Sequence, residues 1–181
     1  FNLTLSLFST CEHKVKEEIV KEVEAFQKQG KTTIVISGNQ GVEGVIALSD
    51  KIKPESQKVI DEVKELNIKT IMLTGDHGSP AKYVADILSI DDVRAGLLPE
   101  NKLTEIISLK EKYGSIAMIG DGVNDAPALA SANVGIAMGA NGSDAAIETA
   151  DICLMNDNLS LIPFLIKLSR RTLSTIKINT F

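Results

Sequence analysis

Aromatic side chains are scarce in this sequence: phenylalanine, tyrosine and tryptophan make up 4% of its 181 residues, and tryptophan is absent. Proteins that bind single-stranded nucleic acids stack the bases on aromatic side chains. Binding to the phosphate backbone needs clustered lysine and arginine, yet the formal net charge here is −5. The composition argues against a nucleic-acid partner, and we expect none.

Long apolar runs and paired cysteines are also missing. No uninterrupted apolar segment reaches the roughly 20 residues of a membrane-spanning helix, and no signal peptide opens the sequence. Cys11 and Cys153 are far apart and lack metal-ligand spacing, so we expect reduced thiols. With 44% hydrophobic residues, the chain suffices for one full domain and part of a second. We expect a soluble segment, wherever the parent protein resides.

Helix and strand patterns divide the chain into two parts. The first part predicts a strand and loop in 1–13, an amphipathic helix over 14–29, and a hairpin of strands 32–37 and 42–48. From residue 54 onward the two patterns alternate, with helices at 54–66, 79–88, 99–112, 125–131 and 143–148 and strands at 69–73, 93–96, 115–119, 133–137 and 151–154. Because the strands at 70–73 and 116–119 are apolar apart from Thr70, both sheet faces should be covered. We predict an α/β fold with a doubly wound parallel sheet.

The tail, residues 159–181, has a helical pattern of apolar residues with added positive charge from Lys167, Arg170, Arg171 and Lys177. One interpretation is an ordinary terminal amphipathic helix. The other is a stalk that leads into a membrane, because basic residues favour the cytosolic side. Charge and periodicity leave both open.

Polar residues follow the predicted strand 69–73, in the sequence Thr74-Gly75-Asp76. Reactive groups in open α/β sheets lie beyond the carboxyl ends of the strands. There a hydroxyl and free backbone N–H groups can hold phosphoryl oxygens, and glycine lets the backbone approach closely. A lone Thr-Gly-Asp is equally compatible with a turn and a helix cap.

A denser polar cluster follows the predicted strand 115–119. Asp121, Asn124 and Asp125 occur within five residues, punctuated by glycines. Carboxylate and amide oxygens are hard ligands that suit Mg²⁺, although Asp125 is also well placed to cap the next helix. Near the start of the helix that Pro99 opens, Lys102 could neutralise phosphate charge.

Together these motifs resemble three of the four sequence signatures of the haloacid-dehalogenase-like phosphotransferases. Longer strings are similar to the hinge and phosphorylation-domain motifs of P-type ATPases, namely residues 72–76, 99–102, 117–129, 134–139 and 147–152. Residues 169–172 and 176–179 resemble the stalk of the heavy-metal branch. The resemblance implies a haloacid-dehalogenase-like (Rossmann-like) parallel sheet, plus the remnant of an inserted nucleotide-binding domain.

The resemblance also implies roles for individual residues. Asp121 and Asp125 would bind Mg²⁺, supported by Asn124. Thr74 and Gly75 would bind phosphoryl oxygens. For ATP, the implied residues are Asp76, Lys102 and the hinge residue Asp50, and Lys102 would also stabilise charge that develops during transfer.

For the chain as a whole, the resemblance implies three parts: a nucleotide-binding remnant over 1–46, the phosphorylation domain over 47–158, and a stalk helix over 159–181. The parent would be an ATP-driven exporter of zinc, cadmium or lead ions, with copper as second choice, at the cytoplasmic face of the cell membrane. Its partners would be ATP, Mg²⁺, the transported ion, and the actuator, nucleotide-binding and membrane domains.

The family's phosphorylated aspartate lies in an Asp-Lys-Thr-Gly-Thr motif that this sequence lacks, so the chain alone should form no phosphoenzyme. His77 and Lys53 stand where Asn and Arg are usual, and we expect weak ATP binding. Two alternatives stay open. One is a soluble Mg²⁺-dependent phosphatase that uses Asp50 as its nucleophile, and the other is a non-catalytic Mg²⁺-binding module.

Overall fold

The computed structural model of the chain describes residues 17–38, 41–49, 51–76, 78–121, 125–139 and 148–179, and the backbone of 4–7. Its elements are β1 (Thr4–Leu7), α1 (Glu17–Lys28), β2 (Thr32–Gly38), β3 (Gly41–Leu48), α2 (Ser56–Glu65), β4 (Ile71–Leu73), α3 (Gly78–Ile87), β5 (Asp92–Arg94), α4 (Pro99–Tyr113), β6 (Ala117–Gly120), α5 (Ala126–Ser131), β7 (Val134–Met138), β8 (Ile152–Leu154) and α7 (Leu161–Asn179). The predicted helix over 143–148 falls largely outside the described residues.

The strands form three sheets, with the orders β1-β2-β3, β4-β5 and β6-β7-β8. The first sheet is antiparallel, and β2 and β3 form the predicted hairpin. The other two are parallel, as predicted. The single doubly wound sheet that we expected is instead divided in two, because no described strand pairs with both β4 and β6. We call β1–β3 with α1 the antiparallel unit, and the chain from α2 onward the parallel unit.

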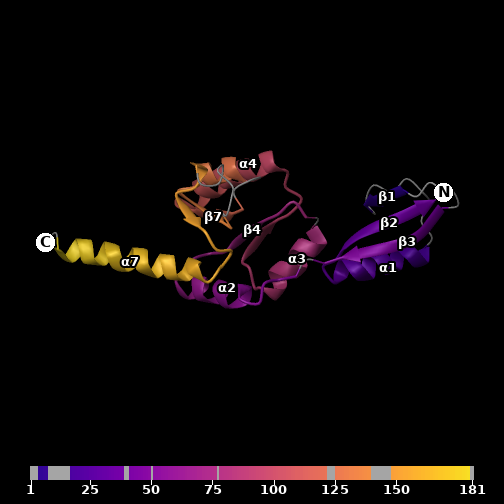
Figure 1. The fold of residues 1–181 in the computed structure, drawn as a ribbon, viewed down its shortest axis with the longest axis horizontal. Coiled ribbons are helices and arrows are strands. Elements are labelled where there is room, and N and C mark those ends of the chain that lie inside the picture. Colours follow the sequence, from indigo (N-terminus) through magenta and orange to yellow (C-terminus); the bar gives the residue numbers. More distant parts are fainter. Residues whose placement is uncertain are drawn as a thin grey trace.

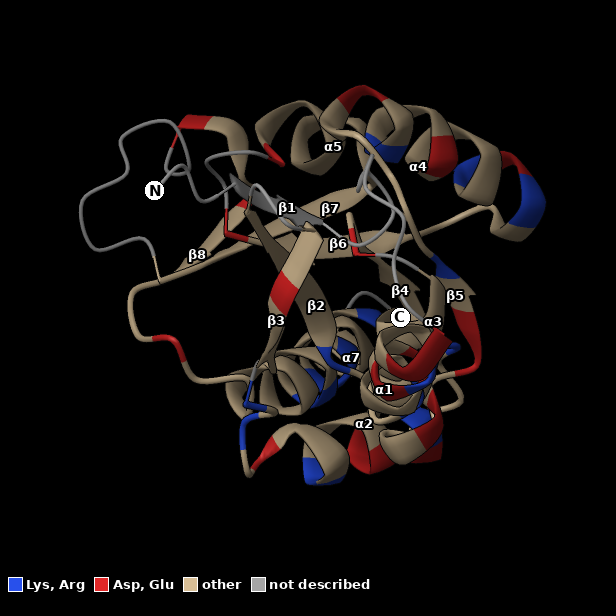
Figure 2. Ribbon diagram, turned by 90° about the vertical axis from the view of Figure 1, so that its right-hand side faces the viewer, with Lys and Arg blue, Asp and Glu red and all other residues tan. Residues whose placement is uncertain are grey.

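Helices cover both faces of the parallel unit (Figure 2). On one face, Met118 of β6 packs with Ile106 of α4 and Leu129 of α5. On the other, Ile136 of β7 packs with residues of α2 and α7, among them Ile162. In β7 the residues from Gly135 to Met138 are all buried, as expected of a strand covered on both faces. In β6, however, Ile119 is 42% exposed, so the prediction that both faces of this strand are covered is wrong.

The antiparallel unit has a small core of its own beneath α1. Val23 of α1 and Val35 of β2 are both 0% exposed. Buried Thr33 lies beside them, and its hydroxyl accepts a hydrogen bond from Gln27 Nε2 at 3.4 Å. Alternating burial along β2 matches a strand with one covered face. This unit lies at one end of an elongated molecule (Figure 1).

The predicted tail helix is α7, and it projects from the opposite end (Figure 1). Its first turns pack on α2, where Lys167 Nζ lies 2.9 Å from Glu62 Oε2. From Lys167 to Asn179 every residue is exposed. Within the described residues, no helix is both long and apolar enough to span a membrane.

Gly135→Ala is expected to lower the free energy of unfolding by about 2 kcal/mol, since overpacking a tight core costs about 1–3 kcal/mol. A Cβ on Gly135 would lie 2.7 Å from the carbonyl oxygen of Leu129, and backbone cannot move as cheaply as a side-chain tip. Urea unfolding of both proteins measures the difference. An unchanged midpoint would mean that α5 can shift away from β7 at little cost.

Asp91→Asn is expected to lower stability at pH 7 by about 1 kcal/mol. The Asp91 carboxylate accepts hydrogen bonds from Thr70 N at 2.8 Å and Oγ1 at 2.9 Å, and Lys64 Nζ lies 3.0 Å away. The Thr70 backbone donor, followed by Lys64, lowers the pKa of Asp91 from 3.8 to about 2.

Because the folded-state pKa of Asp91 is the lower one, its carboxylate stabilises the fold above about pH 4 and loses this effect as the pH falls to about 2. Urea titrations of wild type and Asp91→Asn at pH 7 and near pH 2 should therefore converge at the lower pH. A difference in stability that persists near pH 2 would show that the substitution acts through altered hydrogen-bond geometry and not through the lost charge.

Candidate functional site

Four of the predicted site residues lie where parallel strands or their connections end. Thr74 follows β4, Asp121 follows β6, Lys102 lies in the first turn of α4, and Asp125 directly precedes α5. Two other predicted residues, Asp50 and Asn124, lie outside the described residues, as does His77.

The Thr74–Asp76 segment forms a closed turn. The Thr74 hydroxyl accepts a hydrogen bond from Asp76 N and donates one to Asp76 Oδ2, both at 3.1 Å. A Cβ on Gly75 would lie 3.3 Å from the carbonyl oxygen of Leu97, so glycine suits the close approach of this neighbouring loop. Gly75 and Asp76 are exposed.

The loop after β5 joins this turn to α4. Thr74 N donates to Arg94 O at 3.0 Å, Leu97 N donates to Thr74 O at 3.0 Å, and Gly96 N donates to Asp76 O at 2.7 Å. Two residues later α4 begins, so these three bonds hold the start of α4 beside the turn. We did not predict this connection; its local signal is the Gly96–Pro99 stretch, which is typical of a turn before a helix.

Lys102 meets Asp125 across the site. Lys102 Nζ lies 2.7 Å from Asp125 Oδ1, and their side chains are only 18% and 14% exposed. Asp125 stands at the N-cap position of α5, but its side chain makes no capping hydrogen bond, so the alternative of a side-chain cap is not borne out. Instead, the carboxylate packs over Gly120, where an added Cβ would lie 3.1 Å from Asp125 Oδ2, and pairs with the lysine.

The oxygen ligands suit Mg²⁺ but do not form a complete cage. Among the described residues, no group of three or more His, Cys, Asp and Glu side chains could hold a metal ion. Asp121 and Asp125 supply carboxylates at the end of β6, and Asp121 is exposed. Mg²⁺ is commonly bound by one or two carboxylates together with water and substrate phosphates, so the donor chemistry fits this ion.

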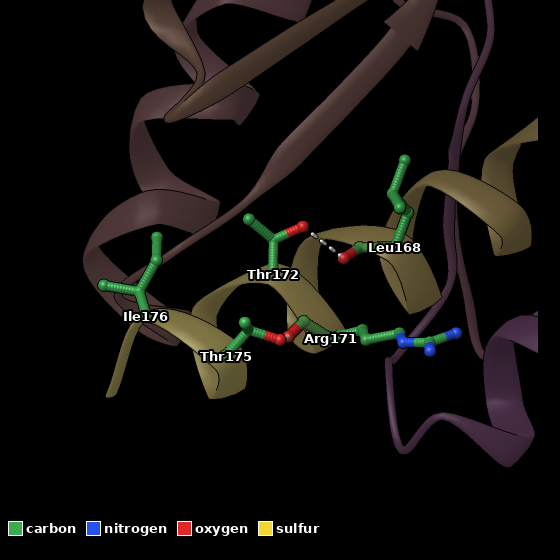
Figure 3. Close-up of a pocket in the computed structure, with 5 residues that line it drawn as sticks. All are labelled: Leu168, Arg171, Thr172, Thr175 and Ile176. Atoms are coloured by element: carbon green, nitrogen blue, oxygen red, sulfur yellow. Dashed lines mark hydrogen bonds between the residues drawn. The ribbon is translucent and has the colours of Figure 1, made fainter. Parts of the chain in front are cut away.

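A separate hollow of about 330 Å³ lies along α7, lined by Leu168, Arg171, Thr172, Thr175 and Ile176 (Figure 3). Thr172 Oγ1 donates to the carbonyl of Leu168, and Thr175 Oγ1 donates to that of Arg171, both at 3.0 Å. The lining contains no carboxylate and none of the predicted site residues. Chemistry therefore points to the ends of β4 and β6 and not to this hollow.

Comparison with known proteins places this site in context. Residues 13–133 match the family model of haloacid dehalogenase-like hydrolases. The chain is 49% identical over 163 residues to a probable cadmium-transporting ATPase of Staphylococcus aureus (strain MRSA252), covering 90% of this chain and 22% of that protein. It is 46% identical to the zinc-transporting ATPase of Bacillus subtilis (strain 168), covering 84% of this chain and 24% of the relative.

A similar solved structure is that of a zinc-transporting PIB-type ATPase in the E2.Pi state. It is 34% identical with a TM-score of 0.79, and the match covers 98% of this chain and 28% of that one. The chain thus spans less than a third of each of these proteins.

Proposed function

The chain belongs to the haloacid dehalogenase-like hydrolases, and we propose that it is the cytosolic phosphorylation-domain part of an ATP-driven heavy-metal cation pump. Three relatives support this proposal: a probable cadmium-transporting ATPase, a zinc-transporting ATPase and a zinc-transporting PIB-type ATPase. The observation that carries it is the pair of Asp125 with Lys102 of α4, the helix whose preceding loop is hydrogen-bonded to the Thr74 turn.

We assign the three parts as the resemblance implied: a remnant of the nucleotide-binding domain over 1–46, the phosphorylation domain over 47–158, and a stalk helix over 159–181. Two features support this division. The antiparallel unit has its own small core beneath α1, and α7 is exposed from Lys167 onward. The remaining domains of the pump would be the partners of this chain, at the cytoplasmic face of the membrane.

The nucleophile would come from a strand that this sequence does not contain. Among the described strands, β4 pairs only with β5, and β6 pairs only with β7. Yet both strands pack on α4, because Leu73 joins the cluster of Ile106 and Met118. One further parallel strand between β4 and β6 would complete a single sheet and would deliver its following residue between Thr74 and Asp121.

The residues of this chain would position and neutralise the phosphoryl group. Asp121 and Asp125, with Asn124, would hold Mg²⁺, which supplies positive charge to the phosphoryl oxygens when bound. Lys102 would stabilise charge that develops during transfer, and Thr74 and Gly75 would bind the same oxygens. In the structure Lys102 is paired with Asp125. The Asp125 carboxylate thereby keeps the Lys102 ammonium group at the site.

For ATP, we propose Asp76, Lys102 and Asp50 as the contacting residues. Zinc, cadmium or lead is the proposed transported ion, which would be cargo bound by membrane segments of the parent. Soft and borderline ions of this kind are selected by ligand type and geometry, and the relatives include a probable cadmium-transporting ATPase and a zinc-transporting ATPase.

Phosphorylation from γ-labelled ATP with Mg²⁺, followed by an acid quench, tests the proposal. This chain should take up no acid-stable label, while the full cytosolic region of the parent should be labelled on an upstream aspartate. Asp50→Asn is the control in both proteins. Label on this chain that disappears in the control would make Asp50 the nucleophile, and the protein would be a soluble Mg²⁺-dependent phosphatase.

If neither protein takes up label while both still bind Mg²⁺, the pump proposal fails and a non-catalytic Mg²⁺-binding module remains. The two alternatives raised by the sequence are therefore distinguished by the same experiment.

A further inference from the structure

The two units touch through α1 and α3. These helices form the main non-covalent contact between the units among the described residues. At this contact the ring of Tyr83, on α3, lies against Gly30, just past the end of α1. A Cβ on Gly30 would lie 2.2 Å from Tyr83 Cδ1 and 2.7 Å from Cγ, so the ring occupies the space that any other residue would need.

Gly30 meets two demands at once. Its φ of 74° belongs to the left-handed region, which glycine adopts without the usual penalty, and it ends α1 in the usual way for a helix. Gly30 N donates to Gln27 O at 3.0 Å, and Lys31 N donates to Phe26 O at 3.1 Å. The turn that ends α1 thus also provides the surface on which the Tyr83 ring packs.

The covalent connection between the units is short and runs from the end of β3 at Leu48 to the start of α2 at Ser56. Lys53 in this connection pairs with Asp157, which precedes α7, so the connection is tied to the parallel unit. What sets the orientation of the antiparallel unit is then the α1–α3 contact. Tyr83 remains 40% exposed, as expected of a contact at the rim of an interface.

We propose that the Tyr83 ring, seated on Gly30, holds the two units in one orientation. Since α3 begins two residues after Asp76, this contact also sets the position of the antiparallel unit relative to the Thr74–Asp76 turn. The inference rests on the geometry of the contact and does not depend on the proposed function.

Backbone ¹⁵N relaxation of the chain tests the contact, because two units held together tumble with one correlation time. Wild type and Tyr83→Phe, which keeps the ring, should show one shared value. Tyr83→Ala removes the ring, and Gly30→Ala places a Cβ in the space that the ring occupies. In both variants the two units should have different correlation times, and the antiparallel unit should tumble faster than the parallel unit.

Gly41→Ala is the matched control for Gly30→Ala. Its φ of 111° is also unfavourable for alanine, but a Cβ there would have no atom within 4 Å, so the shared correlation time should remain. Thermal unfolding followed by circular dichroism checks that each variant is folded. One shared correlation time in both Tyr83→Ala and Gly30→Ala, or two values already in wild type, would overturn the proposal. Neither measurement needs ATP or Mg²⁺, so its result is separate from that of the phosphorylation test.

Discussion

Replacing Leu129 with alanine is expected to lower the free energy of unfolding by about 3 kcal/mol, within the range measured for buried leucines. Leu129 is 0% exposed and belongs to the cluster with Ile106, Met118 and Ala128. The carbonyl of Leu129 also lies against Gly135, so β7 cannot easily move in to fill a cavity. Urea unfolding monitored by circular dichroism measures the loss.

Leu129→Ala should also displace Asp125 at the candidate site. Leu129 N donates to Asp125 O at 2.8 Å, so the residue that anchors α5 in the core also fixes the position of Asp125. Leu168→Ala is the matched control, since Leu168 is 48% exposed on α7 and its loss should change stability by less than about 0.5 kcal/mol. Equal losses in the two variants would mean that the cluster under α5 is not the core of the parallel unit.

Replacing Asp121 with asparagine is expected to weaken Mg²⁺ binding by at least about tenfold. The substitution removes one of two carboxylates at the end of β6 and leaves a neutral amide, whereas Mg²⁺ favours charged oxygen ligands. Isothermal titration calorimetry of the chain with MgCl₂, at millimolar ion concentration because binding should be weak, measures the change.

Asp86→Asn provides the control for net charge. Asp86 is an exposed residue of α3, and its replacement changes the charge by the same amount away from β6. An unchanged titration curve for Asp121→Asn would reject Asp121 as a ligand. A similar loss in Asp86→Asn would show that the chain attracts Mg²⁺ through its overall negative charge alone.

Local patterns predicted most of the secondary structure. The helix expected over 99–112 is α4 at 99–113, and the strand expected over 133–137 is β7 at 134–138. These segments have strong apolar periodicity or apolar runs, and they have proline or glycine at their ends. Such local signals are sufficient to predict a helix or a strand. The local sequence pattern did not decide the role of a residue with several possible roles, and Asp125 is the example. As a potential cap it obeys a rule of helix ends, but its carboxylate pairs with Lys102, 23 residues earlier in the chain.

The sequence by itself determined the alternation of helices and strands, the parallel pairing that such alternation requires, and the residue types at the carboxyl ends of the strands. Each of these depends on neighbours within a few residues, where side-chain periodicity and turn chemistry act. Only the tertiary structure decided that the parallel strands fall into two sheets, that Lys102 neutralises Asp125, and that Tyr83 rests on Gly30. Those outcomes depend on atoms far apart in the chain, which meet only after burial of the apolar faces has brought the elements together.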